Sequence, residues 1–222
     1  MDNVIEFNEF TVSANCSNGE ACCWLCQKGT SLRALFCQYC GTIQPVRALD
    51  YFSRLGLERR IDVDSDLLER QYAAYKRALE PERFVLRGMG ERGHAAKQLE
   101  AMEEAYQTLR EPLRRGRYWL ALHEKEMAEA DAANPMVAEL RRDLNEAGQA
   151  SQCDRIAQKA GNAMEQGVVS LMQALRSQNW PLANAILFEV DGLESILKDV
   201  RDRRTVLAPH MGVNADDLAS VK

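Results

Sequence analysis

Residues 23–40 read CWLCQKGTSLRALFCQYC and contain two Cys-x-x-Cys pairs with ten residues between them. Each pair can direct two thiolates at one tetrahedral ion while the chain between the pairs turns back. Four cysteine ligands leave no position for a catalytic water, so such a metal would be structural. So short a segment cannot bury its own core, and zinc adds about 10 to 16 kcal/mol to the folding of small peptides. We therefore expect one structural zinc ion on Cys23, Cys26, Cys37 and Cys40.

Other uses of the cysteines are a pair of redox-active dithiols or a disulfide scaffold. A redox motif needs one Cys-x-x-Cys on a packed α/β frame, which this sequence does not suggest. Six of the seven cysteines lie between Cys16 and Cys40, unlike disulfides spread through a secreted domain. Cys22 could replace Cys23 as a ligand, but the spacing would become Cys-x-x-x-Cys. We expect Cys16 and Cys153 to be free thiols.

The residues that follow Pro45 show the apolar spacing of helices. Asp64 or Ser65 is a candidate N-cap for a helix whose apolar residues fall on one face: Leu68, Tyr72, Tyr75 and Leu79. A glycine-punctuated loop, Glu80 to Gly93, leads to a second stripe of the same kind: Leu99, Met102, Tyr106 and Leu109. The pattern predicts two antiparallel helices joined by an exposed loop.

In the C-terminal half, the spacing of apolar residues predicts three helices that can cover one another's apolar faces. Pro112 permits a short helix before them, and the Ala-rich, polar residues 128–134 indicate a domain joint. The residues after Pro209 have too little apolar content to fold. The sequence thus predicts an all-α fold in four parts: a small zinc-stapled module at 1–47, a helical hairpin unit at 48–128, a three-helix bundle at 129–207 and a polar tail at 208–222.

Composition excludes several classes of function. The chain is 46% hydrophobic and 27% charged and has no apolar run of 18 residues, so no membrane partner is expected. Residues 1–10 carry three acids and no Lys or Arg, unlike a signal or transit peptide, and we expect a cytoplasmic protein. The net charge of −5 and the acidic excess of residues 1–47 disfavour a nucleic-acid partner.

Residues 88–93, GMGERG, match the Gly-x-Gly-x-x-Gly pattern of dinucleotide-binding proteins. That fold also needs a βαβ unit with an acidic residue near the end of a second strand, and here the corresponding place falls in a helical stretch. We therefore interpret these glycines as a loop. The three histidines share no metal-ligand spacing, and we expect no catalytic residues and no enzymatic activity.

Several segments in order resemble the HscB family, the DnaJ-type co-chaperones of iron–sulfur cluster assembly. Besides the cysteine segment, they are DYFSRLGL at 50–57, LERQYAAYKR at 68–77 and EAYQTLREPLRRGRY at 104–118. The resemblance runs from about Cys23 to Val200, includes Trp180 before the last helix, and fits the variant of the family with a zinc-bearing N-terminus. It implies a J-domain at 48–128 followed by the bundle that carries a cluster scaffold protein.

In that family, a basic helix and a His-Pro-Asp loop dock on a DnaK/HscA-class chaperone and stimulate its ATPase. The resemblance therefore implies these chaperone-binding residues: Arg70, Lys76, Arg77, Glu80, Pro81 and Glu82. The loop departs from the family, because Glu80-Pro81-Glu82 replaces an imidazole donor by an anionic acceptor and lengthens the second acid by one methylene. If the chaperone offers a hydrogen-bond acceptor or a carboxylate at this position, the histidine of the family would be attracted to it and Glu80 would be repelled.

The resemblance also implies these scaffold-binding residues in the bundle: Met136, Glu139, Glu146 and Leu193. Arg142 stands where the family prefers an acid, and Gly192 stands where an aromatic contact is expected. Loss of one aromatic hot spot costs about 2 kcal/mol or more of binding free energy.

Two interpretations follow from the resemblance. The first is a co-chaperone that brings an iron–sulfur cluster scaffold protein to a DnaK/HscA-class chaperone, with altered or weakened ATPase stimulation. The second is a J-like adaptor that has lost this stimulation and binds a different protein. The sequence leaves weak self-association open.

Overall fold

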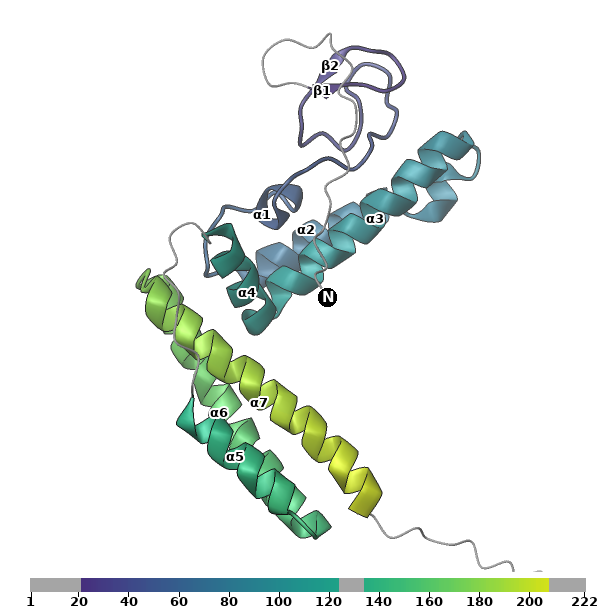
Figure 1. The fold of residues 1–222 in the computed structure, drawn as a ribbon. Helices are drawn as coiled ribbons and strands as arrows, with labels where there is room; N and C mark the ends of the chain where they lie inside the picture. The colour runs from purple at the N-terminus through teal and green to yellow at the C-terminus, as the bar shows by residue number, and fades with distance from the viewer. Residues whose placement is uncertain (1–20, 124–133, 208–222) are drawn as a thin grey trace, which may run out of the picture. The chain divides into compact units, whose positions relative to one another are not determined.

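The computed structural model describes residues 21–123 and 134–207 (Figure 1). The chain divides into two compact units, Met1–Arg115 and Gly116–Lys222. The two strands are β1 (Ala21–Cys22) and β2 (Gly29–Thr30), and a short 3₁₀ helix is η1 (Pro81–Phe84). The α-helices are α1 (Tyr51–Arg54), α2 (Ser65–Ala78), α3 (Met89–Arg110), α4 (Pro112–Leu122), α5 (Pro135–Glu146), α6 (Ala150–Arg176) and α7 (Trp180–Leu207). The expectations for Cys16, for the polar tail and for residues 128–133 of the joint lie outside the described residues.

The helical hairpin of the first unit is formed by α2 and α3, which lie side by side (Figure 1). The Asp64 side chain caps α2 by accepting hydrogen bonds from the backbone N–H groups of residues 66 and 67, at 2.9 and 3.1 Å. Tyr72 on α2 and Tyr106 on α3 stack with their ring centroids 4.0 Å apart. The Tyr106 hydroxyl donates back to Glu69 of α2 at 2.5 Å. The predicted hairpin is therefore confirmed.

The cysteine-bearing segment packs on α3 within the same unit. Gln98, in the middle of α3, is buried and donates from Nε2 to the backbone carbonyls of Gln44 at 3.0 Å and Pro45 at 3.1 Å. These carbonyls belong to the stretch that leaves the cysteine cluster. Buried polar groups need such partners, so the two bonds fix the segment against the helix.

The second unit contains the bundle of α5, α6 and α7. Asn134 caps α5 by accepting from the backbone N–H of Met136 at 2.9 Å, and Pro135 occupies the first helical position. The interior contains residues from all three helices: Leu140, Leu144, Cys153, Ile156, Ala160, Leu193, Ile196 and Val200. Cys153 is a free thiol in this core, as expected.

One predicted boundary was wrong. The loop expected at Glu80–Gly93 ends early, because α3 begins at Met89, and it contains the 3₁₀ helix at Pro81–Phe84. Glycine is a poor helix former, and three glycines within six residues concealed the start of α3. In the described residues, no helix is both long enough and apolar enough to span a membrane.

Candidate functional site

The four cysteines lie on two tight turns that reverse the chain in the same way. In the first turn, the backbone N–H of Gln27 donates to the carbonyl of Cys23 at 3.0 Å; in the second, Gly41 donates to Cys37 at 2.9 Å. Gln27 and Gly41 have φ of 62° and 72°, the left-handed conformation that the reversal requires. Each turn thereby directs both of its thiols to one point.

The sulfur atoms have the spacing of a tetrahedral metal site. The distance between the Sγ atoms is 3.7 Å for Cys23 and Cys40 and 3.7 Å for Cys26 and Cys37. All four sulfurs lie within 4.8 Å of one another. A tetrahedral ion with metal–sulfur bonds of about 2.3 Å has sulfur–sulfur edges of about 3.8 Å. The geometry therefore fits one metal ion, and Cys23 rather than Cys22 belongs to the group, as expected.

The electrostatics of the cluster also suit a cation. Burial raises the pKa of the Cys23 thiol, but hydrogen bonds from the backbone of Cys26 and Leu25 and from the Gln44 side chain outweigh it and bring the pKa down to about 6. At Cys40 a backbone hydrogen bond from Thr42 lowers the pKa, but burial and the neighbouring cysteine sulfurs raise it to about 12. Neighbouring thiolates repel one another, so four thiols this close together do not all lose their protons without a positive charge nearby. A bound cation supplies that charge.

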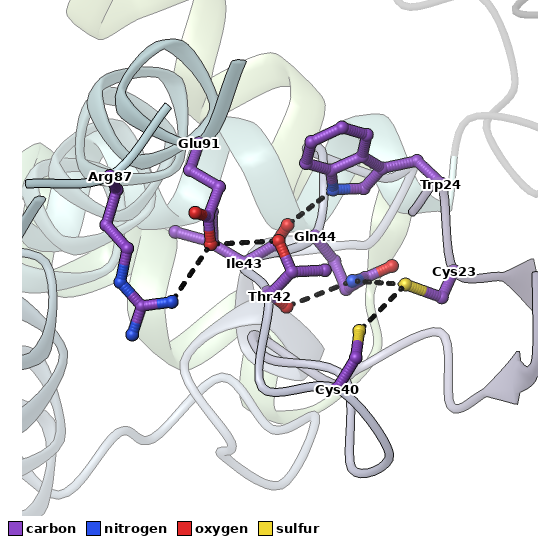
Figure 2. Close-up of polar contacts among 8 residues, drawn as sticks. All are labelled: Cys23, Trp24, Cys40, Thr42, Ile43, Gln44, Arg87 and Glu91. Atoms are coloured by element: carbon purple, nitrogen blue, oxygen red, sulfur yellow. Dashed lines mark hydrogen bonds and ion pairs between the residues drawn. The ribbon is translucent and has the colours of Figure 1, made fainter. Parts of the chain in front are cut away.

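A fully buried glutamine supports the cluster from behind. The Nε2 atom of Gln44 lies 3.3 Å from the sulfur of Cys23 and donates to the backbone carbonyl of Thr42 at 3.1 Å (Figure 2). Arg47 donates from Nη2 to Gln44 Oε1 at 3.2 Å and so holds the amide in this orientation. Such neighbours orient metal ligands and reduce the negative charge on their sulfurs.

Trp24, inside the first Cys-x-x-Cys pair, joins the cluster to α3. Its indole Nε1 donates to the carbonyl of Ile43 at 2.7 Å (Figure 2), and its ring meets His94 edge-on with centroids 5.1 Å apart. Burial, and then the nearby charge of Lys97, lower the pKa of His94. A Cβ added at Gly90 would lie 3.4 Å from the Trp24 ring. Gly90 therefore lies in van der Waals range of the Trp24 ring, whereas an added Cβ at Gly88 or Gly93 would meet nothing within 4 Å; sequence reasoning missed that residues 89–93 begin a helix.

The six residues expected to bind a chaperone are all exposed; five of them lie at or just after the end of α2, and Arg70 lies in the first half of that helix. Arg70, Lys76 and Arg77 are exposed on α2, and the last two lie in its final turn, where cations complement the helix dipole. Glu80 precedes η1, and Pro81 and Glu82 form its first turn; all three are exposed. A pocket of about 450 Å³ lies beside this loop. Its lining is mostly apolar but includes three charged side chains: Arg92, Glu100 and Glu103.

The residues expected to bind a scaffold protein differ in their exposure to solvent. Met136, Glu139 and Glu146 are exposed on α5. Leu193 has no exposed surface, because it lies in the interior among α5, α6 and α7, and its assignment as a contact residue is corrected. A Cβ at Gly192 would lie 2.8 Å from a methyl group of Val137, so this position holds two helices together and has no room for an aromatic side chain.

Comparisons with known proteins agree with this fold. The iron-sulfur cluster co-chaperone protein HscB homolog of Arabidopsis thaliana is 31% identical over 171 residues, which cover 74% of this chain and 67% of that protein. The iron-sulfur cluster co-chaperone protein HscB of Homo sapiens is 36% identical over 95 residues, 42% of this chain and 40% of that protein. No model of a protein family matches the chain.

Solved structures show the same fold. The crystal structure of human co-chaperone protein HscB has a TM-score of 0.70 at 24% identity and covers 84% of this chain and 100% of that chain. Chaperone HscB from Vibrio cholerae has a TM-score of 0.56 at 23% identity over 72% of this chain and 99% of that chain. The hairpin and the bundle define a helical fold that the solved co-chaperones named HscB share. The chain belongs to the HscB family.

Proposed function

We propose that this protein is a co-chaperone that presents an iron–sulfur cluster scaffold protein to a DnaK/HscA-class chaperone and assists cluster assembly. The observation that carries the proposal is the combination of a basic, exposed α2 with a separate helical bundle in a member of the HscB family. The role is binding without chemistry.

The metal at the cysteine centre is proposed to be zinc. Four thiolates with tetrahedral spacing suit zinc or an iron–sulfur site, and zinc is the usual ion in two turns of this kind. Zinc would act as a closed structural centre that joins the two turns. Elemental analysis of protein purified without added metal should find one zinc per chain; iron in its place would refute the assignment.

The chaperone-docking surface is proposed to consist of Arg70, Lys76 and Arg77 together with the loop Glu80–Glu82. Three cations on the exposed face of one helix steer an encounter with an acidic surface, and such steering weakens as salt rises. The Glu80 carboxylate accepts hydrogen bonds, so a chaperone acceptor that meets a histidine in the family would here meet a second acceptor. We therefore expect weakened stimulation of the chaperone ATPase.

The scaffold-binding surface is proposed to include Met136, Glu139 and Glu146 on α5. Met136 is 43% exposed and supplies an apolar contact, while the two carboxylates on the same helix supply charge. On α7, Phe188 is 47% exposed and is a further apolar candidate that sequence reasoning missed. The alternative function is a J-like adaptor without ATPase stimulation that uses this bundle for a different protein, and the closed position at Gly192 favours a changed partner.

Binding to a purified DnaK-class chaperone in its ATP state tests the docking surface. The double substitution Lys76→Glu plus Arg77→Glu should weaken binding about tenfold at low salt, because each exposed charge contact contributes up to about 1 kcal/mol. The matched control is Arg155→Glu plus Lys159→Glu, which makes the same change of charge on the exposed face of α6. Equal effects of the two pairs, or none, would refute the assignment to α2.

A further inference from the structure

The first two turns of α3 are weak as an isolated helix. The N-cap position is Gly88, which makes no side-chain capping bond, and Gly90 and Gly93 follow within those turns. Glycine disfavours a helix, and a missing cap leaves backbone N–H groups without a partner from that side chain. Contacts from elsewhere must therefore contribute to holding these turns in place.

Those contacts come from the cysteine-bearing segment. The hydroxyl of Thr42, two residues after the ligand Cys40, donates to Glu91 Oε1 at 2.9 Å (Figure 2). One and two turns further along α3, His94 meets the Trp24 ring and Gln98 donates to the Gln44 carbonyl. The start of the helix is thus attached at three successive levels to residues inside or beside the metal-binding turns.

A second set of contacts leads from Glu91 to the altered loop. Arg87 Nη1 lies 3.5 Å from Glu91 Oε1, the oxygen that also accepts from Thr42 (Figure 2). The backbone N–H of Arg87 donates to the carbonyl of Phe84 at 3.0 Å, and that of Arg83 donates to Glu80 at 3.0 Å. Glu91 therefore lies between the metal-binding turn and the segment that carries Glu80, Pro81 and Glu82.

We propose that the four-cysteine centre positions the start of α3 and the Glu80–Arg87 segment, so that loss of the metal loosens both. A bound ion fixes the Cys37–Cys40 turn against the Cys23–Cys26 turn, and this fixes Thr42 and the Gln44 carbonyl where Glu91 and Gln98 meet them. Metal occupancy then controls the order of a segment that begins 40 residues after the last cysteine ligand in sequence. The consequence for chaperone affinity rests on the proposed function, whereas the structural coupling does not.

Hydrogen exchange on the full-length protein tests the coupling directly. Amide exchange in residues 82–98 is compared between zinc-loaded protein and protein stripped with a chelator, with residues 102–110 of the same helix as the internal reference. We expect exchange in 82–98 to become about tenfold faster without zinc, the factor that one hydrogen bond to a charged group represents, while the reference stays unchanged. Equal rates in 82–98 with and without zinc would overturn the proposal.

Two threonine variants separate this contact from general damage to the module. Thr42→Val keeps the shape of a side chain that is 1% exposed and removes only its hydroxyl. Thr30→Val makes the same change at a side chain that is also 1% exposed and whose hydroxyl has no hydrogen-bond partner among the described residues. With zinc bound, the first should speed exchange in 82–98 several-fold and the second should not. Equal behaviour of the two would contradict the proposed route.

Glu91→Gln approaches the same contact from the helix and leaves the cysteine module intact. It keeps the size of the side chain but removes the charge that Arg87 meets, so it should also speed exchange in 82–98 at full zinc content. Chaperone binding is measured on the same samples. Weaker binding of the zinc-free protein supports the functional consequence, and unchanged binding with faster exchange overturns it. No binding by either form refutes the proposed function, and exchange alone then decides the coupling.

Discussion

Gly192→Ala should destabilise the helical bundle although alanine favours a helix. The added Cβ would lie 2.8 and 3.0 Å from the two methyl groups of Val137, closer than side-chain contacts normally allow. Valine has one preferred rotamer in a helix, so its methyl groups cannot turn away freely. Overpacking costs about 1 to 3 kcal/mol, and the better helix propensity of alanine returns about 1 kcal/mol. We expect a net loss of about 0 to 2 kcal/mol in the free energy of unfolding.

Gly161→Ala is the matched control for this prediction. Gly161 lies inside α6 with no heavy atom of another element within 4 Å of an added Cβ, so alanine should stabilise the unit by about 0.5 to 1 kcal/mol. Urea unfolding is followed by tryptophan fluorescence in a Trp24→Phe background, where the remaining indoles, Trp119 and Trp180, both belong to the second unit. Val137→Ala should relieve the loss at Gly192. Equal stability of the two alanine variants would refute the packing argument.

Three further predictions concern the first unit. Although burial raises the pKa of Asp50, its hydrogen bonds and the nearby Arg59 guanidinium lower it, so this carboxylate stabilises the unit above its unfolded pKa of about 3.9. That stability is lost as pH falls through the lower folded value, and Asp50→Asn should make acid unfolding measured by circular dichroism less steep. Gln98→Leu leaves the buried Gln44 carbonyl without this partner and should cost about 1 to 3 kcal/mol in urea unfolding, with zinc content unchanged. Metal removal should unfold residues 21–47 in NMR amide spectra while the helical circular dichroism signal persists; an unchanged spectrum there would contradict a structural role for the metal.

The sequence predicted those features that depend on local spacing. Two Cys-x-x-Cys pairs identify their own partner ligands, because a tetrahedral ion accepts few other arrangements. Capping chemistry placed the start of α2 at Asp64 or Ser65, and the structure has Asp64 as the N-cap. The apolar stripe from Leu68 to Leu79 likewise predicted which face of α2 packs on α3, because helical periodicity determines that face.

Features that depend on tertiary contacts were not predictable in this way. The start of α3 is held by Thr42 and Trp24, which lie about 50 to 65 residues earlier, so glycine propensity alone indicated a loop. The family resemblance implied a scaffold contact at Leu193, whereas the apolar spacing of the last helix placed Leu193 on its buried face; the structure places it in the core among α5, α6 and α7. The close approach of Gly192 to Val137 has no local signal at all.

The most direct test of the proposed function is the ATPase rate of a DnaK-class chaperone with this protein and the cluster scaffold protein. Wild type is compared with Glu80→His plus Glu82→Asp, both at exposed positions that leave the fold intact. We predict weak stimulation by the wild type and clearly stronger stimulation by the double variant. Stimulation only by the variant would favour the adaptor function. If neither protein stimulates a chaperone that responds to another J-domain, the proposal that this hairpin docks on such a chaperone is contradicted.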